Sequence, residues 1–306
     1  MFILPLILFL VPALCLVPPQ RDFPHSGRNL GRRFNNLTFI EGRVFEVSLP
    51  NGKSAGCQGI ESYPSDWPNS YYYKLRNQIK PSLNNVCPER MCYSGLGFPV
   101  ITDSLANDAS LERTAWTLDN IMSTVDPYVT NIMIQAFFRQ AVMGRFPSEV
   151  VTSLPEYSHL DPNFWYNRRG CGATDGIPVG SNAEEDVLCY SDDLYFDQDI
   201  TVHEFAHSLH LLGFKHTWPE FQQELDVAYA NAYANSLWGW GYIGSYAMTN
   251  DEEYFAEGLQ AYFDVGYPYD EQGAPWNRAL LYQKDPTLAK IIDRFMKQNP
   301  WRGSCP

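Results

Sequence analysis

The sequence predicts an α+β protein, with short strands in its first half and a strongly helical second half, stabilised by disulfide bonds. Three observations indicate this class. Apolar residues recur at the spacing of buried helix faces between residues 104 and 263. Short apolar runs bounded by turn residues occur before and between these helical segments. The chain has 306 residues, enough to bury a substantial core as one large domain or two modest ones.

The N-terminal segment predicts secretion. Residues 2–17 are almost wholly apolar and uncharged, and Ala13-Leu14-Cys15 resembles a signal-peptidase site. We therefore expect a signal peptide over residues 1–15. An uncleaved anchor is the alternative, although the segment is short for a membrane span of about 20 residues.

Residues 16–100 are predicted to form an N-terminal arm and a disulfide-bearing lobe, and residues 101–306 a second domain. Residues 16–33 are polar, rich in Gly, Pro and Arg, and end in Arg32-Arg33. They read equally well as a short propeptide or as a flexible arm. Asn36-Leu37-Thr38 is an N-glycosylation acceptor, which fits the secretory route.

Six cysteines remain once Cys15 is removed with the signal peptide. An even number of cysteines in a secreted chain predicts three disulfides, whose connectivity the sequence leaves open. A cysteine metal cluster is disfavoured because no CxxC spacing occurs. The disulfide candidates are Cys57, Cys87, Cys92, Cys171, Cys189 and Cys305.

The charge balance excludes two classes of partner. The chain carries 35 acidic and 22 basic side chains, a formal net charge of −13. A nucleic-acid surface needs positive charge to displace phosphate counterions, and anionic lipid also repels an acidic protein. We expect no nucleic-acid partner, no membrane partner after signal cleavage, and only a weak bias towards basic substrates. The oligomeric state is not predicted.

The elements of the second half follow from periodicity and from turn residues. Gly213 is expected to end one helix, and Pro219 to lie in the first turn of the next. A long loop region is expected over 145–185. The expected helices cover 104–122, 127–137, 201–212, 219–238 and 251–263, and the expected strands cover 139–143 and 186–190.

The most informative stretch is His203-Glu204-Phe205-Ala206-His207. In a helix, residues i and i+4 lie on one face, so both imidazoles can bind one zinc ion with Glu204 beside the remaining position. A shuffled chain of this composition would contain roughly 0.006 such matches. Two surface histidines on a core helix are the bland alternative.

A catalytic zinc site needs a third protein ligand and one open position. Glu253, in Glu253-Tyr254-Phe255-Ala256-Glu257, is the preferred candidate, with Glu257 one turn later expected to hydrogen-bond a ligand histidine. The alternatives are His210 and His216. They miss the metzincin spacing by one step.

These motifs carry a family resemblance. His203-Glu204-Phe205-Ala206-His207, Tyr246 seven residues before Glu253, and Glu253-Tyr-Phe-Ala-Glu257 resemble the zincin metallopeptidases of the anthrax lethal factor and Pro-Pro endopeptidase type. The resemblance covers roughly residues 105–265. It implies a zincin-like catalytic domain within 101–306, with an active-site helix, a small mixed sheet, Glu253 as third ligand and Tyr246 facing the substrate carbonyl. The secretory signal and the six cysteines depart from lethal factor, so substrate preference does not transfer.

The predicted function is therefore secreted zinc-dependent endopeptidase activity on a peptide or protein substrate. One Zn²⁺ per chain would activate water, and Glu204 would act as general base. The alternative is a secreted non-catalytic zinc-binding or toxin-like protein on the same scaffold. The intact Glu204 favours the enzyme, because a purely structural site needs no base.

Two weaker hypotheses concern the segment before the zinc helix. Residues 187–190 are a candidate edge strand for an extended substrate, or an ordinary strand of the sheet. The acidic run could bind calcium, or it could be a solvated loop whose last members favour the positive helix N-terminus. Its acids are Asp192, Asp193, Asp197 and Asp199.

Overall fold

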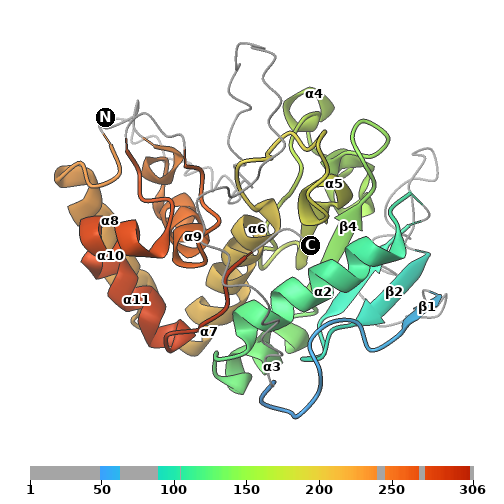
Figure 1. Cartoon of the computed structure of the whole chain (residues 1–306), viewed down its shortest axis with the longest axis horizontal. Helices are drawn as coiled ribbons and strands as arrows, with labels where there is room; N and C mark the ends of the chain where they lie inside the picture. Colours follow the sequence, from blue (N-terminus) through green and yellow to red (C-terminus); the bar gives the residue numbers. More distant parts are fainter. Residues whose placement is uncertain (1–48, 63–88, 104, 240–244, 269–272, 304–306) are drawn as a thin grey trace, which may run out of the picture.

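A mixed five-stranded sheet forms one half of the protein and helices form the other (Figure 1). The computed structural model describes residues 49–62, 89–103, 105–239, 245–268 and 273–303. The α+β prediction is confirmed. The predicted signal peptide, residues 16–33, Asn36, Cys87 and Cys305 lie outside the described residues.

The strands follow one another across the sheet in chain order, β1 to β5. The pairs β1–β2 and β2–β3 are antiparallel, whereas β3–β4 and β4–β5 are parallel. The predicted division at residues 100 and 101 falls within β3. The strands are β1 (Ile60–Ser62), β2 (Arg90–Tyr93), β3 (Pro99–Thr102), β4 (Arg139–Met143) and β5 (Val179–Ala183).

Helix α2 (Asp108–Met122) packs on one face of the sheet through Leu111 and Ala115, which contact Val100 and Val142. The register places Val100, Gln140 and Gly180 in one row. Helix α6 (Ile200–Ser208) reaches the same face, because Ser208 Oγ lies 3.1 Å from where a Cβ on Gly180 would be. The two helices therefore share this face.

The opposite face of the sheet is covered by residues 151–165, whose Leu154 and Trp165 pack on Ile101, Ala141 and Val179. The sequence predicts only loop in this region. Within the predicted loop region, 145–185, the structure has strand β5 and, over 151–165, a series of short helical turns that bury apolar side chains. These turns are η1 (Val151–Ser153), η2 (Pro155–Tyr157) and α4 (Pro162–Trp165).

The helices of the other half pack against α6 in one large apolar core. Within the described segments, no helix is both long and apolar enough to span a membrane. The remaining helices are α3 (Pro127–Gln135), α5 (Glu184–Val187), η3 (Leu209–Phe214), α7 (Lys215–Thr217), α8 (Phe221–Ala234), η5 (Tyr246–Met248), α9 (Asp251–Tyr262), α10 (Arg278–Lys284) and α11 (Pro286–Met296).

The predicted strand over 186–190 is wrong. Residues 184–187 form the helical turn α5, and Cys189 has a φ of 57°, which no strand accommodates. A short apolar run has the same appearance in a strand and in a buried turn, so its pattern does not separate them. The edge-strand hypothesis for residues 187–190 fails with it. Beside β5, Cys171 instead pairs with Ser181 in an antiparallel bridge.

Gly213 does not end its helix. The helix passes from α6 through a π-helical segment, η3, into α7 and ends at Thr217. Gly213 lies against α3, where an added Cβ would be 3.0 Å from Val129 and 3.4 Å from the Met133 sulfur. The glycine therefore serves close packing between two helices and not termination.

One disulfide joins Cys57 to Cys92, and so ties the segment before β1 to strand β2. Cys171 and Cys189 are also disulfide-bonded. These four cysteines agree with the prediction of a disulfide-stabilised protein.

Candidate metal centre

Two carboxylates hold the N-terminus of α6, the helix that carries the candidate zinc ligands. Asp199 is its N-cap and accepts from the Val202 N–H at 3.0 Å. Asp186 accepts from the N–H groups of Ile200 and Thr201, both at 3.2 Å. Free N–H groups at a helix start favour such negatively charged acceptors. The acidic residues before the helix thus fix its position.

His203, His207 and Glu253 converge on one buried point. His203 Nε2 lies 3.2 Å from His207 Nε2, and Glu253 Oε2 lies 3.1 Å from the first nitrogen and 3.3 Å from the second. Tetrahedral zinc with bonds near 2.0–2.1 Å separates its ligand atoms by about 3.3 Å. The three atoms therefore have the spacing of one face of a zinc tetrahedron, and the cluster could bind a metal.

Helix α9 supplies Glu253 from its first turn. The Asn250 side chain caps this helix and accepts from the Glu253 N–H at 2.7 Å. The Tyr246 hydroxyl donates to Glu253 Oε1 at 3.1 Å. Glu253 thus turns one oxygen to the tyrosine and the other to the two histidines. Tyr246 therefore lies beside the three candidate ligands and holds the Glu253 carboxylate.

Glu204 is buried beside the two histidines on α6, and its Oε1 has no hydrogen-bond partner within the part of the chain that the structure describes. Burial raises the pKa of Glu204 to about 7. The positive charges of both histidines and a hydrogen bond from the Gly172 N–H oppose this rise. A carboxylate with a pKa near the working pH suits a general base.

Two side chains of α9 approach His203 Nδ1. Glu257 Oε1 lies 3.8 Å from His203 Nδ1, beyond hydrogen-bonding distance. Gln260 Oε1 lies 2.9 Å from the same nitrogen. Gln260 follows Glu253 by seven residues and so lies on the same face of α9. That spacing is the only signal by which the sequence could have indicated it.

The alternative ligands do not join the cluster. His210 is buried between Phe221 and Phe255, with Nε2 2.8 Å from Gln222 Oε1, and burial lowers its pKa to about 4. His216 pairs with Asp175 at the surface. Among the described residues, His203, His207 and Glu253 form the one group of three or more residues able to hold a metal.

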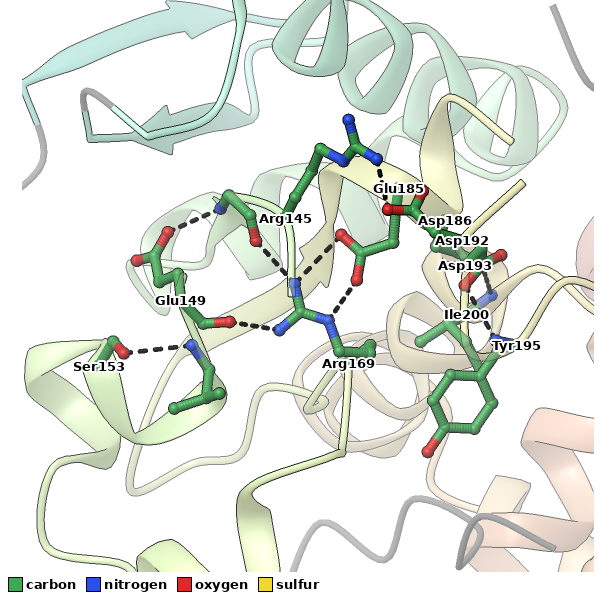
Figure 2. A network of polar contacts seen from close by, with 12 residues as sticks. Arg145, Glu149, Ser153, Arg169, Glu185, Asp186, Asp192, Asp193, Tyr195 and Ile200 are labelled. Atoms are coloured by element: carbon green, nitrogen blue, oxygen red, sulfur yellow. Dashed lines mark hydrogen bonds and ion pairs between the residues drawn. The ribbon is translucent and has the colours of Figure 1, made fainter. Parts of the chain in front are cut away.

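The acidic run after residue 190 is used within the fold. Asp192 forms an ion pair with Arg145, and Asp193 accepts from the Tyr195 N–H at 2.9 Å (Figure 2). Asp199 caps α6. Exposed Asp192 and the cap Asp199 follow the solvated-loop and helix-cap alternative, whereas Asp193 is buried. The calcium hypothesis gains no support from these roles.

Residues 170–172 cross α6 close to the candidate metal ligands, and nothing in the sequence predicts this contact. A Cβ on Gly170 would lie 2.5 Å from Glu204 Cγ, and a Cβ on Gly172 would lie 2.3 Å from His207 Cβ. Only glycine leaves room for this approach. The two glycines flank Cys171, which pairs with Ser181 of β5, so the sheet edge is held directly against the site.

Arg169 anchors this segment (Figure 2). Its guanidinium is fully buried and donates to both carboxylate oxygens of Glu185, at 2.5 and 3.2 Å. It also donates to the carbonyl oxygens of Glu149 and Gly144, both at 2.6 Å. Each guanidinium nitrogen donates at least one of these hydrogen bonds, and such a bidentate, multiply bonded arginine has a fixed orientation. Arg169 therefore fixes the position of the backbone immediately before Gly170 and Gly172.

Comparisons with known proteins give little further information. No family model and no curated protein matches the chain. Among 18 matching chains of solved structures is the Pro-Pro endopeptidase from Paenibacillus alvei, with 13% sequence identity and a TM-score of 0.41. The match covers 64% of this chain and 96% of that one. At this identity and TM-score, it does not establish a shared fold or activity.

Proposed function

We propose that the protein is a zinc-dependent endopeptidase. The carrying observation is the buried triangle of His203, His207 and Glu253 donor atoms, at zinc-ligand spacing, beside a buried Glu204. The order of the motifs along the chain, with Tyr246 seven residues before Glu253, supports a zincin of the lethal factor and Pro-Pro endopeptidase type.

The residues of this chain divide the chemistry of peptide hydrolysis among them. When bound, zinc supplies the Lewis acidity that lowers the pKa of water to about 7. Glu204 takes the proton of the attacking water and returns it to the leaving amine. Tyr246, released from Glu253, would stabilise the negative charge on the substrate carbonyl oxygen, a contribution typically worth roughly 3 kcal/mol in the barrier.

A non-catalytic zinc protein is the second candidate, and two observations disfavour it. Structural zinc sites normally have four protein ligands. Here the described residues offer three, and His210 is engaged with Gln222. The buried Glu204 carboxylate also has no structural partner for its Oε1 among the described residues. Burying a carboxylate oxygen without a partner costs free energy, and a purely structural zinc site does not need that carboxylate.

We also propose that the mature protein acts outside the cell. The apolar segment over residues 2–17 and the glycosylation acceptor at Asn36 support this localisation. The disulfide between Cys57 and Cys92 is typical of an oxidising compartment.

The test is cleavage of a diverse peptide library by the zinc-loaded protein and by Glu204→Gln. We expect the variant to keep its zinc and to lose at least about 10²-fold in kcat/KM, because the glutamine cannot accept the proton. Glu224→Gln is the matched control, because Glu224 lies on α8 in a partly exposed ion pair with Arg294. This variant should cleave peptides as the wild type does. Equal cleavage by Glu204→Gln and wild type would refute the mechanism. Zinc binding without cleavage of any peptide would favour the non-catalytic candidate.

A further inference from the structure

The side-chain amide of Gln260 has only one chemically sensible orientation. Gln260 is fully buried on α9, and its Nε2 lies 2.9 Å from the main-chain carbonyl oxygen of Asp199. A carbonyl oxygen only accepts hydrogen bonds, so the NH₂ group of the amide must face it. A second contact, at 3.4 Å from Gln198 Oε1, uses the other N–H of the same group.

This orientation determines where His203 carries its proton. With its NH₂ directed at Asp199, Gln260 turns Oε1 to His203 Nδ1 at 2.9 Å. An amide oxygen accepts, so Nδ1 must be the protonated nitrogen of the ring. The lone pair of the neutral ring is then on Nε2, which is the nitrogen that lies 3.2 Å from His207 Nε2 and 3.1 Å from Glu253 Oε2.

Gln260 also connects the two ligand-bearing helices. Asp199 is the N-cap of α6, and its carbonyl oxygen accepts both from Gln260 and from the His203 N–H at 3.2 Å. The amide therefore bridges the first turn of α6 to a ring four residues further on. Gln260 lies two turns after Glu253 on α9, and its hydrogen bond to His203 links that helix to α6.

We infer that Gln260 is the positioning residue of the metal centre, which sets the tautomer and the ring orientation of His203. The inference rests on the proposed zinc site. Glu257, which has the spacing expected of this role, is 3.8 Å from the same nitrogen. A neutral amide in this position orients the imidazole without adding a further negative charge to a centre that already holds Glu253 and Glu204.

The experiment measures zinc affinity of the full chain by competition with a chelator, for Gln260→Leu and for the control Glu257→Gln. Leucine fills a similar volume and makes no hydrogen bond. Loss of such an orienting group typically lowers metal affinity about 10–100-fold, and we expect this loss for Gln260→Leu. We expect less than about a threefold loss for Glu257→Gln. Equal zinc affinity in Gln260→Leu and wild type, or a larger loss in Glu257→Gln, would overturn the assignment.

A second measurement does not depend on the folding of a variant. Nitrogen NMR of zinc-loaded wild type should show His203 protonated at Nδ1 and metal-bound through Nε2. Metal bound through Nδ1 would overturn the inference. Neither readout requires turnover, so both remain decisive if no peptide is cleaved. Absence of zinc binding by the wild type would instead refute the proposed function on which the inference rests.

Discussion

Gly172→Ala would test how closely the glycine segment must approach the zinc helix. A Cβ at this position would lie 2.3 Å from His207 Cβ and 3.1 Å from its Cγ. Carbon atoms attract each other best at about 3.5–4.0 Å, so the segment or the helix must move by roughly 1 Å. The atom that is met first is a Cβ, which moves only with the backbone of α6. The clash therefore cannot be relieved by a side-chain rotation.

The magnitude follows from two opposing effects. Overpacking in a well-packed interior typically costs about 1–3 kcal/mol. Gly172 does not have a left-handed φ, so alanine brings no backbone strain, and its smaller unfolded-state entropy offsets about 0.4–1 kcal/mol. We expect a net loss of about 1–2 kcal/mol in unfolding free energy, or roughly 2–8 °C in Tm.

Zinc binding should be more sensitive than stability to this change. Metal–ligand distances tolerate changes of about 0.2 Å, whereas the displacement imposed on His207 is several times larger. We expect zinc affinity to fall at least about tenfold, which corresponds to about 1.4 kcal/mol. Thermal unfolding of the metal-free protein and chelator competition measure the two quantities separately.

Gly176→Ala is the matched control for this prediction. Its nearest contact would be Thr174 Oγ1 at 3.9 Å, and it also lacks a left-handed φ. It should leave zinc affinity unchanged and keep or slightly raise Tm. If Gly172→Ala matched this control in both quantities, the close approach of the segment to the helix would be refuted.

Three further predictions follow from the charged groups. Burial raises the pKa of Glu149 to about 7, so the contribution of Glu149 to stability is present below about pH 4.5 and is lost as the pH rises through 7. The variant Glu149→Gln can still accept from the Gly144 N–H, and in urea unfolding it should be more stable than wild type by about 2–3 kcal/mol at pH 8 and equally stable near pH 4. The same difference in stability at both pH values would contradict this prediction. Burial lowers the pKa of both ligand histidines, but the neighbouring carboxylates outweigh it, raising the pKa of His203 to about 10 and that of His207 as well; zinc binding at pH 7 should therefore release protons, and a calorimetric enthalpy that did not vary with buffer ionisation would refute this. Tyr246→Phe should lower kcat by roughly 10²-fold with a smaller loss of zinc affinity, and unchanged kcat would remove its catalytic role.

The sequence predicts the parts of the site that one helix presents. His203, Glu204 and His207 lie together because the period of an α-helix brings i and i+4 to one face, whatever surrounds it. Glu253 could be ranked above His210 and His216 because those two miss the metzincin spacing and because of the family resemblance. The spacing between two helices depends on packing, and the sequence contains no measure of it. The structure places Glu253 Oε2 within 3.3 Å of both histidines, which supports Glu253 as the third ligand.

Where the predictions fail, local patterns were ambiguous. The apolar run over 186–190 suits a strand or a buried turn. In the structure it is a turn, and Asp186 in that turn accepts hydrogen bonds from the N–H groups of Ile200 and Thr201 at the start of α6. Gly213 has the appearance of a helix terminator, but its lack of a side chain serves close contact with α3.

The sequence by itself determined the α+β class, the helix with its two histidines and base, and the candidates for a third ligand. These depend on interactions within a few residues, which the periodicity of apolar and polar side chains records. Only the tertiary structure decided that Gln260 lies at 2.9 Å and Glu257 at 3.8 Å from His203 Nδ1, and that two glycines beside Arg169 bring the sheet edge against the zinc helix. The contacts of these residues with Glu204, His207 and His203 join positions 34 or more apart, and a difference of about 1 Å in packing selects between a hydrogen bond and none.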